Sequence, residues 1–308
     1  MTEGATRWSF EERGRCEACD GTRRRRLGLR GDRPLTASLR SDGQVVTTVY
    51  RCVQCGLVYC DPVPLGVSVE EVYGGVDDYF TIAIDDERLA YYRSLAEDLR
   101  RRTGRAGRLL DVGCGRGEFV YSASQAGWDA HGVDPDSAFV DFAKRRFGLT
   151  NVVAAELDEA GFADASFDAI TLNGVLEHIP RPRAALVQAA RLLAPGGILF
   201  FEVPNGGVLR FSAADAVLRL IGSGLTSHLS PFRPPFHLYE FSAAAARRML
   251  DTVGLTCEAV HFHPGKNRFP HYSGLRNRVL RTAYGALVAA ENATGRTYNL
   301  HVYARRGT

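Results

Sequence analysis

The chain has 308 residues, of which 45% are hydrophobic and 24% charged, and its formal net charge is +3. These values are typical of a globular protein with an ample core, in one large or two modest domains, and the charge alone does not indicate nucleic-acid binding. No apolar run approaches the roughly eighteen residues of a membrane span, and the first residues contain no apolar signal segment, so we expect a cytoplasmic protein with no membrane partner.

Two cysteine pairs mark the N-terminal part of the chain, Cys16-x-x-Cys19 and Cys52-x-x-Cys55. A spacing of two residues lets both sulfurs of a pair reach one ion, and two such pairs suit a tetrahedral zinc site. The alternative is four free or disulfide-bonded cysteines, because the spacer between the pairs is long for a zinc ribbon. Because four thiolates leave no open position, the zinc would be structural. We predict a small zinc-ribbon-like module over residues 1–62.

Between the pairs lies the arginine run 23–26. It is either a phosphate-binding finger or a solvated loop, and we favour the loop because few aromatic residues are interleaved with it. Residues 63–104 then form a linker rich in glycine and proline, followed by a charged amphipathic helix over 85–103.

Residues 108–117 begin with an apolar strand that ends in Asp111 and continue with glycines at 113, 115 and 117 before a predicted helix over 117–126. Strand, glycine turn and helix let a nucleoside-type cofactor lie against bare backbone. A dinucleotide fingerprint requires its third glycine where Glu118 stands, so a pyrophosphate is disfavoured. A second strand, 130–134, ends in Asp134, which can accept both hydroxyls of a ribose. The alternative is an ordinary turn followed by an unrelated acid.

The remaining elements alternate between strand and helix, which predicts a Rossmann-like, doubly wound α/β fold with a mostly parallel sheet. We expect helices at 136–147, 182–194 and 242–253, and strands at 151–154, 168–173, 197–203, 255–263 and 297–305. Two insertions, 206–236 and 264–294, are predicted to be substrate lids, because ligands bind beyond the carboxyl ends of parallel strands. For 264–294 a packing extension or the surface of a homodimer is the alternative.

Three segments together carry a family resemblance. They are Leu-Asp-Val-Gly-Cys-Gly-Arg-Gly at 110–117, Phe-Asp-Ala-Ile-Thr-Leu-Asn-Gly-Val-Leu-Glu-His at 167–178, and Leu-Leu-Ala-Pro-Gly-Gly at 192–197. Over about residues 73–260 the chain resembles class I S-adenosylmethionine-dependent methyltransferases. The resemblance implies a seven-stranded sheet with an antiparallel edge strand in a catalytic domain over 105–308. Residues 63–104 would then cover the cofactor cleft.

The resemblance also implies which residues bind S-adenosylmethionine. The first glycine turn would hold the methionine end, the acid after the second strand the ribose, and the stretch after the third strand the adenine. An aromatic side chain from the linker would close over the sulfonium. The implied set is Asp111, Gly113, Cys114, Gly115, Asp134, Pro135, Glu156, Leu157, Asn173 and Tyr79.

Two histidines are candidates for a catalytic general base. His178 follows the fourth strand, and the alternative is a structural histidine that ties this loop to the sheet. His237 lies where the first lid ends, and the alternative is a turn residue. A histidine with an ordinary pKa near 6.5 can serve either role.

The leading hypothesis is methyl transfer from S-adenosylmethionine to an oxygen of a small molecule or sugar. The second is an RNA methyltransferase in which the zinc module recognises RNA, although no base-methylating motif follows the fourth strand. The third is a non-methylating enzyme that uses the cofactor only structurally, because a fold alone does not fix an activity.

Overall fold

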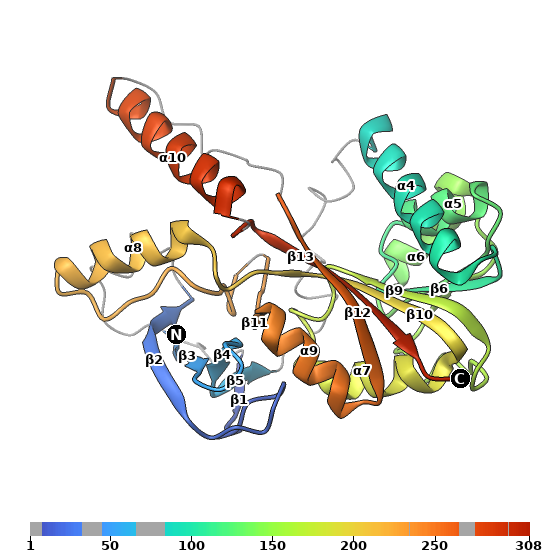
Figure 1. The fold of residues 1–308 in the computed structure, drawn as a ribbon, viewed down its shortest axis with the longest axis horizontal. Coiled ribbons are helices and arrows are strands. Elements are labelled where there is room, and N and C mark those ends of the chain that lie inside the picture. The colour runs from blue at the N-terminus through green and yellow to red at the C-terminus, as the bar shows by residue number, and fades with distance from the viewer. Residues whose placement is uncertain (1–7, 33–44, 66–83, 234, 265–274, 295) are drawn as a thin grey trace, which may run out of the picture.

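The structure is a computed structural model that describes residues 8–32, 45–65, 84–233, 235–264, 275–294 and 296–308. A twisted central sheet runs through the molecule, with helices on both of its faces, and the cysteine-containing segment lies at the lower left of Figure 1. Among the helices that the structure describes, none has the length and apolar character needed to cross a bilayer. The cofactor candidate Tyr79 lies outside the described residues.

The central sheet has seven strands in the order β12-β13-β10-β9-β6-β7-β8. Strands β10, β9, β6, β7 and β8 are mutually parallel, whereas β13 runs antiparallel to both β10 and the edge strand β12. The predicted parallel sheet with an antiparallel pairing at one edge is therefore confirmed. The strands are β6 (Arg108–Val112), β7 (Asp129–Asp134), β8 (Val152–Ala154), β9 (Phe167–Asn173), β10 (Leu193–Pro204), β12 (Leu255–His263) and β13 (Asn299–Arg306).

Among the described residues, helices cover both faces of the sheet, with α4, α5 and α6 on one face and α7 and α9 on the other (Figure 1). The central strands are apolar on both faces, as in β10, where consecutive Phe200 and Phe201 are fully buried in different core clusters. Buried parallel strands have this composition because helices pack on both sides. The helices are α4 (Asp86–Thr103), α5 (Glu118–Gln125), α6 (Ser137–Phe147), α7 (Pro182–Leu192) and α9 (Ala243–Thr252).

Cys52 ends β3 of a small antiparallel sheet with the order β11-β4-β3-β2, which lies beside a two-stranded ribbon of β1 and β5. The other three paired cysteines lie in loops and turns next to this sheet. Its fourth strand comes from far along the chain, because β11 pairs Tyr239 with Tyr59 of β4. The last strand of the ribbon ends at Leu65, three residues beyond the predicted boundary at 62. The strands are β1 (Ser9–Glu11), β2 (Arg24–Gly31), β3 (Val46–Cys52), β4 (Val58–Asp61), β5 (Val63–Leu65) and β11 (Tyr239–Glu240).

This cysteine module shares one hydrophobic core with the central sheet. At the boundary Arg183 of α7 donates to both carboxylate oxygens of Asp20 at 2.8 and 3.0 Å, and its Nε donates to the Glu17 carbonyl at 2.8 Å. Ser242, which caps α9, also donates its hydroxyl to the Cys55 carbonyl. A bidentate guanidinium and shared apolar burial fix orientation. The module is therefore placed rigidly against α7 and α9.

The arginine run was predicted to be a loop, and this prediction is wrong. Arg24, Arg25 and Arg26 begin β2, which is the edge strand of the small sheet. Arg24 bonds to Asp61, and its guanidinium carbon lies 4.0 Å from the centre of the Tyr50 ring. Charged side chains are common on edge strands because they prevent further strands from pairing. This role explains the run without a phosphate ligand.

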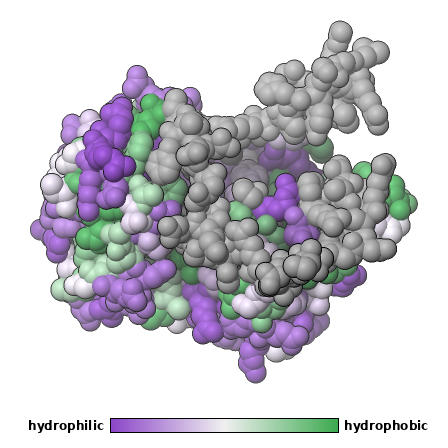
Figure 2. Space-filling view, turned by 180° about the vertical axis from the view of Figure 1, so that it is seen from behind, coloured by the Kyte–Doolittle hydropathy of each residue, from purple (hydrophilic) through white to green (hydrophobic). Residues whose placement is uncertain are grey.

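Each of the two predicted lid insertions contains a helix, α8 (Leu209–Leu220) and α10 (Leu275–Thr294), and these two helices lie side by side (Figure 1). Arg210 joins them through an ion pair with the buried Glu291, 3.0 Å from Nε to Oε2. Figure 2 shows hydrophobic residues at its right-hand edge. At the end of α8, Leu220 and Ile221 are 86% and 62% exposed. Whether the insertions act as lids stays a prediction.

Candidate functional site

The glycine turn connects β6 to α5 and crosses the carboxyl end of β7. Gly113 and Gly115 have φ angles of 68° and 50°, in the left-handed region that glycine tolerates best. The Gly113 amide donates to the Val133 carbonyl at 2.8 Å, and the Gly115 amide donates to Asp134 Oδ2 at 2.8 Å. Cys114 is buried, with its sulfur against Gly132. The turn is thus held by its own backbone bonds, with Gly115 open to a ligand among the residues described.

Asp111 ends the apolar part of β6 and is only 3% exposed. Its Oδ1 accepts hydrogen bonds from Thr171 Oγ1 at 2.6 Å and from Asn173 Nδ2 at 3.0 Å, both on the neighbouring strand β9. Burial raises the pKa of the carboxyl to about 7, and the two hydrogen bonds oppose that rise. A cation beside this buried carboxyl group would favour its ionised form, because the positive charge stabilises the carboxylate.

Asp134 ends β7 and is buried beside the glycine turn. Its two oxygens accept from the Gly115 amide and, at 2.9 Å, from the Asp136 amide, while burial raises its pKa. Pro135 is exposed next to it. Three other predicted positions follow the same edge, since Glu156 and Leu157 come after β8 and Asn173 ends β9. The structure therefore brings the described cofactor candidates to one edge of the sheet.

The two candidate base histidines lie together, although they are far apart in the sequence. Their ring centres are 5.0 Å apart, and the Nε2 atoms of His178 and His237 lie 3.8 and 3.9 Å from Oε1 of Glu177. Glu177 is 4% exposed, and its Oε2 is buried with no hydrogen-bond partner among the residues that the structure describes. Burial raises the pKa of Glu177 to about 8 and lowers those of His178 and His237 to about 4 and 3.

Hydrogen bonds hold the loop that carries His237 against the loop after β9. The Glu177 carbonyl accepts from the amides of Leu238 at 2.8 Å and Tyr239 at 3.3 Å, and His178 Nδ1 donates to the Phe236 carbonyl at 3.3 Å. Phe236 has a φ angle of 56°, which is strained for a bulky side chain. Strained backbone concentrates at functional sites, where the surrounding contacts enforce it.

A second cluster around Glu202 of β10 was missed by the sequence reasoning. Glu202 Oε2 lies 2.9 Å from His301 Nε2 and accepts from the Tyr91 hydroxyl at 3.1 Å, while Asn299 donates to Oε1. His263 stacks on His301 with ring centres 4.4 Å apart. No local motif surrounds these residues. Glu202 faces His301 through the antiparallel register of β10 and β13, which no local pattern in the sequence indicates.

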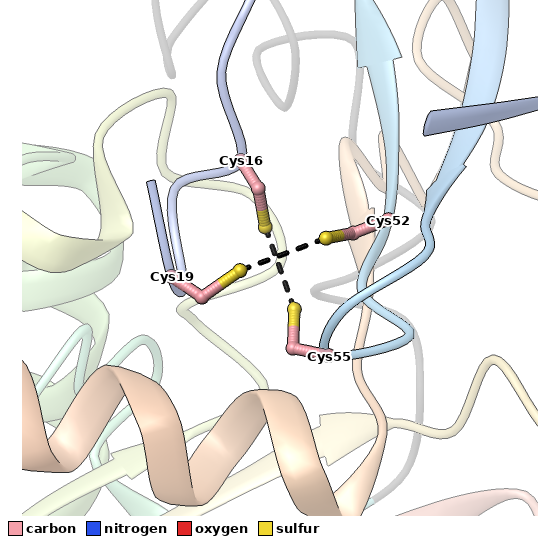
Figure 3. A group of neighbouring side chains, drawn as sticks. All are labelled: Cys16, Cys19, Cys52 and Cys55. Atoms are coloured by element: carbon pink, nitrogen blue, oxygen red, sulfur yellow. Dashed lines mark hydrogen bonds between the residues drawn. The ribbon is translucent and has the colours of Figure 1, made fainter. Parts of the chain in front are cut away.

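The four paired cysteines converge on one point, as Figure 3 shows. The Cys16 and Cys55 sulfurs are 3.5 Å apart, those of Cys19 and Cys52 are 3.6 Å apart, and all four lie within 4.8 Å of one another. A tetrahedral zinc ion with bonds of about 2.3 Å requires sulfurs about 3.8 Å apart. The cluster fits such an ion, and none of the cysteines forms a disulfide.

Comparison with known proteins now adds to this geometry. The family described as a methyltransferase domain matches residues 85–260. The chain belongs to this family. The ubiquinone biosynthesis O-methyltransferase of Coxiella burnetii (strain Dugway 5J108-111) is 28% identical over 216 residues, which cover 60% of this chain and 90% of the relative. The enzyme of the same name from Methylococcus capsulatus is 32% identical over 182 residues, 56% of this chain and 74% of the relative.

Solved structures were compared as well. The 1,6-didemethyltoxoflavin-N1-methyltransferase of Burkholderia thailandensis has a TM-score of 0.49 at 18% identity, covering 83% of this chain and 97% of that protein. As a class I S-adenosylmethionine-dependent methyltransferase, the chain has the predicted fold and enzyme class, and both predictions are confirmed.

Proposed function

We propose that this methyltransferase transfers the methyl group to an oxygen of a small molecule. The convergence of Glu177, His178 and His237 near the carboxyl end of β9 is the observation that carries the proposal. A hydroxyl acceptor must lose its proton as it is methylated, and a buried carboxylate with two imidazoles is suited to help it do so. The relatives named as O-methyltransferases support the same chemistry. A sugar hydroxyl is one acceptor of this kind.

The proposal places S-adenosylmethionine along the edge already described. Asp111 and the turn of Gly113, Cys114 and Gly115 would hold the cationic methionine end. Asp134 and Pro135 would contact the ribose, because two backbone amides orient the Asp134 carboxylate beside the glycine turn. The adenine would lie at Glu156 and Leu157, and the reacting sulfur beside Asn173.

Methyl transfer itself needs alignment above all. The acceptor oxygen must approach within about 3 Å of the methyl carbon, opposite the sulfur, and such alignment is worth up to about 7–11 kcal/mol. The acceptor's O–H bond breaks, an O–C bond forms, and the C–S bond breaks with its electron pair returning to sulfur. In this proposal His178 and His237 assist the release of the proton, which passes to solvent, and the sheet edge fixes the line of attack.

We also propose that Cys16, Cys19, Cys52 and Cys55 hold a structural zinc ion. The ion would tie β3 to the loop before β2, in a segment that has little core of its own. Chelation of the purified protein should release this zinc and lower its thermal transition by several degrees. Full stability of the metal-free protein would refute the structural role.

The test of the activity is a search for product with the intact protein. Purified enzyme is mixed with labelled S-adenosylmethionine and pools of hydroxylated small molecules, and both S-adenosylhomocysteine release and a gain of about 14 Da in an acceptor are measured. An oxygen-methylated product supports the proposal. Methylation confined to nitrogen or to RNA, or cofactor binding with no release from any pool, would overturn it. A homodimer stays a prediction for sedimentation analysis.

A further inference from the structure

We infer that Glu177, His178 and His237 form a second metal site, separate from the cysteines, which binds a divalent first-row cation. One carboxylate oxygen and two imidazole nitrogens, each offering a ligand atom, lie within 4.8 Å of one another. Nitrogen and oxygen donors in this number suit zinc, iron, cobalt or manganese ions. The inference deepens the proposed function, on which it depends only for what the ion does.

The orientation of His178 is the first argument. Its Nδ1 lies 3.3 Å from the Phe236 carbonyl, which can only accept, so this nitrogen carries the ring proton. In the neutral ring the Nε2 lone pair then faces Glu177, with Oε1 3.8 Å away and too distant for a hydrogen bond. Metal-binding histidines are oriented in the same way, by a second-shell carbonyl on the nitrogen that does not bind the ion.

The unsatisfied carboxylate is the second argument. Glu177 Oε2 is buried without a partner among the described residues, and a buried polar atom left without a hydrogen bond costs about 1–3 kcal/mol. His237 approaches the same carboxylate, with Nε2 3.9 Å from Oε1. Three bonds of about 2.0–2.2 Å to one ion need ligand atoms about 3–3.5 Å apart, so small side-chain rotations complete the site. An ion would give the carboxylate the partner that it lacks.

The third argument is that the site is built from two loops held in a strained conformation. The Glu177 carbonyl accepts from Leu238 and Tyr239, which fixes the loop immediately after His237. The φ angle of 56° at Phe236 aims the next residue back toward Glu177. A simple turn does not need this strain, whereas a site that must point two imidazoles at one carboxylate does.

Three protein ligands leave at least one coordination position open, and catalytic metal sites have this arrangement. The ligand class that we assign to the open position is a small acceptor with two adjacent oxygens, such as a catechol, a vicinal diol or a hydroxy acid. A divalent cation lowers the pKa of a bound hydroxyl, so its proton passes to solvent at neutral pH. The freed oxygen then attacks the methyl carbon as described above.

Cobalt separates the two metal sites, because thiolate ligands add intense charge-transfer absorption that nitrogen and oxygen ligands do not. The full-length protein is stripped by chelation and titrated with Co²⁺, and bound metal is counted. We expect about two ions per chain for the unaltered protein and about one, with full thiolate absorption, for Glu177→Gln and for His237→Ala. His261→Ala is the matched control, because His261 is exposed on β12, and it should keep both ions.

Manganese provides a second measurement, because it avoids thiolates. Free Mn²⁺ is followed by electron paramagnetic resonance, and we expect Glu177→Gln to weaken its binding by at least about 10-fold relative to His261→Ala. One cobalt ion per unaltered chain, or a second ion retained equally by all three variants, would overturn the inference. So would methyl transfer that survives chelation of every ion outside the cysteines, and that result would leave the proposed function standing. Absence of any methylated product would instead refute the proposed function, and the measured number of bound ions would still support the metal site.

Discussion

Glu177 and Glu202 both lie beside histidines near the carboxyl ends of central strands, yet their carboxylates are bonded in opposite ways. Glu202 receives Tyr91, His301 and Asn299 on its two oxygens. Glu177 has one oxygen without a partner among the described residues, and the two histidine nitrogens lie 3.8 and 3.9 Å from its other oxygen. The Glu202 carboxylate therefore has hydrogen bonds on both oxygens, whereas Glu177 Oε2 can still bind a ligand.

The pKa values follow the same difference. Burial alone would raise both carboxyl pKa values. Around Glu202 the hydrogen bonds from His301 and Tyr91 outweigh burial, and the pKa is lowered. Around Glu177 burial dominates and raises the pKa to about 8, and a hydrogen bond from its own backbone amide offsets only part of that rise. A satisfied cluster therefore stabilises the fold, whereas an unsatisfied one is available for a ligand.

The largest effect should come from the unsatisfied cluster. We expect Glu177→Gln and His237→Ala to lower turnover by about 10²–10⁴-fold, because the acceptor loses the group that assists its deprotonation. The free energy of unfolding should change by only about 1 kcal/mol or less, since Glu177 Oε2 has no bond to lose. Rates of S-adenosylhomocysteine release at saturating cofactor measure the first quantity, and urea unfolding measures the second.

His261→Ala serves as the control for this experiment, because it removes an imidazole from an exposed position. Near-normal turnover in both cluster variants would mean that alignment of the cofactor and acceptor is the only catalytic device. If the cluster variants unfold so easily that the loss of folded protein accounts for the loss of turnover, the cluster is structural, like that of Glu202.

The satisfied cluster should show the opposite pattern. Glu202→Ala removes the acceptor for Tyr91, His301 and Asn299, so we expect unfolding to become easier by about 2–3 kcal/mol. Equilibrium denaturation in urea, with an unchanged slope, measures this. Glu258→Ala is the matched control, because Glu258 lies on the edge strand β12 and forms partly exposed ion pairs with Arg102 and Arg305. This substitution should lower the free energy of unfolding by less than about 1 kcal/mol. Equal costs for the two variants would remove the distinction between the clusters.

A substitution at the edge of the sheet that is proposed to bind the cofactor should have an intermediate effect. Asp134→Ala should weaken S-adenosylhomocysteine binding by about 10–100-fold, because the ribose hydroxyls lose a carboxylate that two backbone amides orient. Titration calorimetry measures the affinity. Asp129→Ala is a suitable control, since Asp129 begins the same strand at its opposite end and is exposed. Unchanged affinity in Asp134→Ala would refute the ribose assignment.

The order of elements could be predicted from the sequence, because periodicity and glycine turns are local signals. The strands and helices of the central sheet follow the predicted alternation along the chain, and the family resemblance supplied the seven strands and the antiparallel edge. Asp111, the glycine turn and Asp134 could be found in the same way, since each follows a strand directly. Their roles toward the cofactor stay predictions.

The acceptor side could not be assembled from local signals. Glu177 and His178 are adjacent, but His237 joins them only because its loop bonds to the Glu177 carbonyl across the fold. Glu202 and His301 face each other only through the register of β10 and β13. The small sheet likewise gains Tyr239 from the end of the first insertion. Each of these depends on long-range pairing, which no window of sequence encodes.

The smallest effect concerns Asp111, which resembles Glu177 in burial and Glu202 in having partners. Its carboxyl pKa of about 7 reflects burial first, with the charges of Asp134 and Glu118 adding to the rise. A folded-state pKa above the ordinary value near 4 means that the ligand-free protein binds this proton more tightly than the unfolded chain does. The stability of the ligand-free protein should therefore fall as the pH rises from about 4 to about 7.

A bound cationic cofactor favours the ionised form of Asp111 instead. The affinity for the cofactor should therefore increase about 5–10-fold between pH 6 and pH 8, with a proton released on binding near pH 7. Calorimetry in buffers of different ionisation enthalpy detects that proton, and Asp111→Asn should abolish both the release and the pH dependence. If the asparagine variant keeps the same pH dependence, the proton belongs to another group, and Asp111 is a structural partner of Thr171 and Asn173, as Glu202 is of its own neighbours.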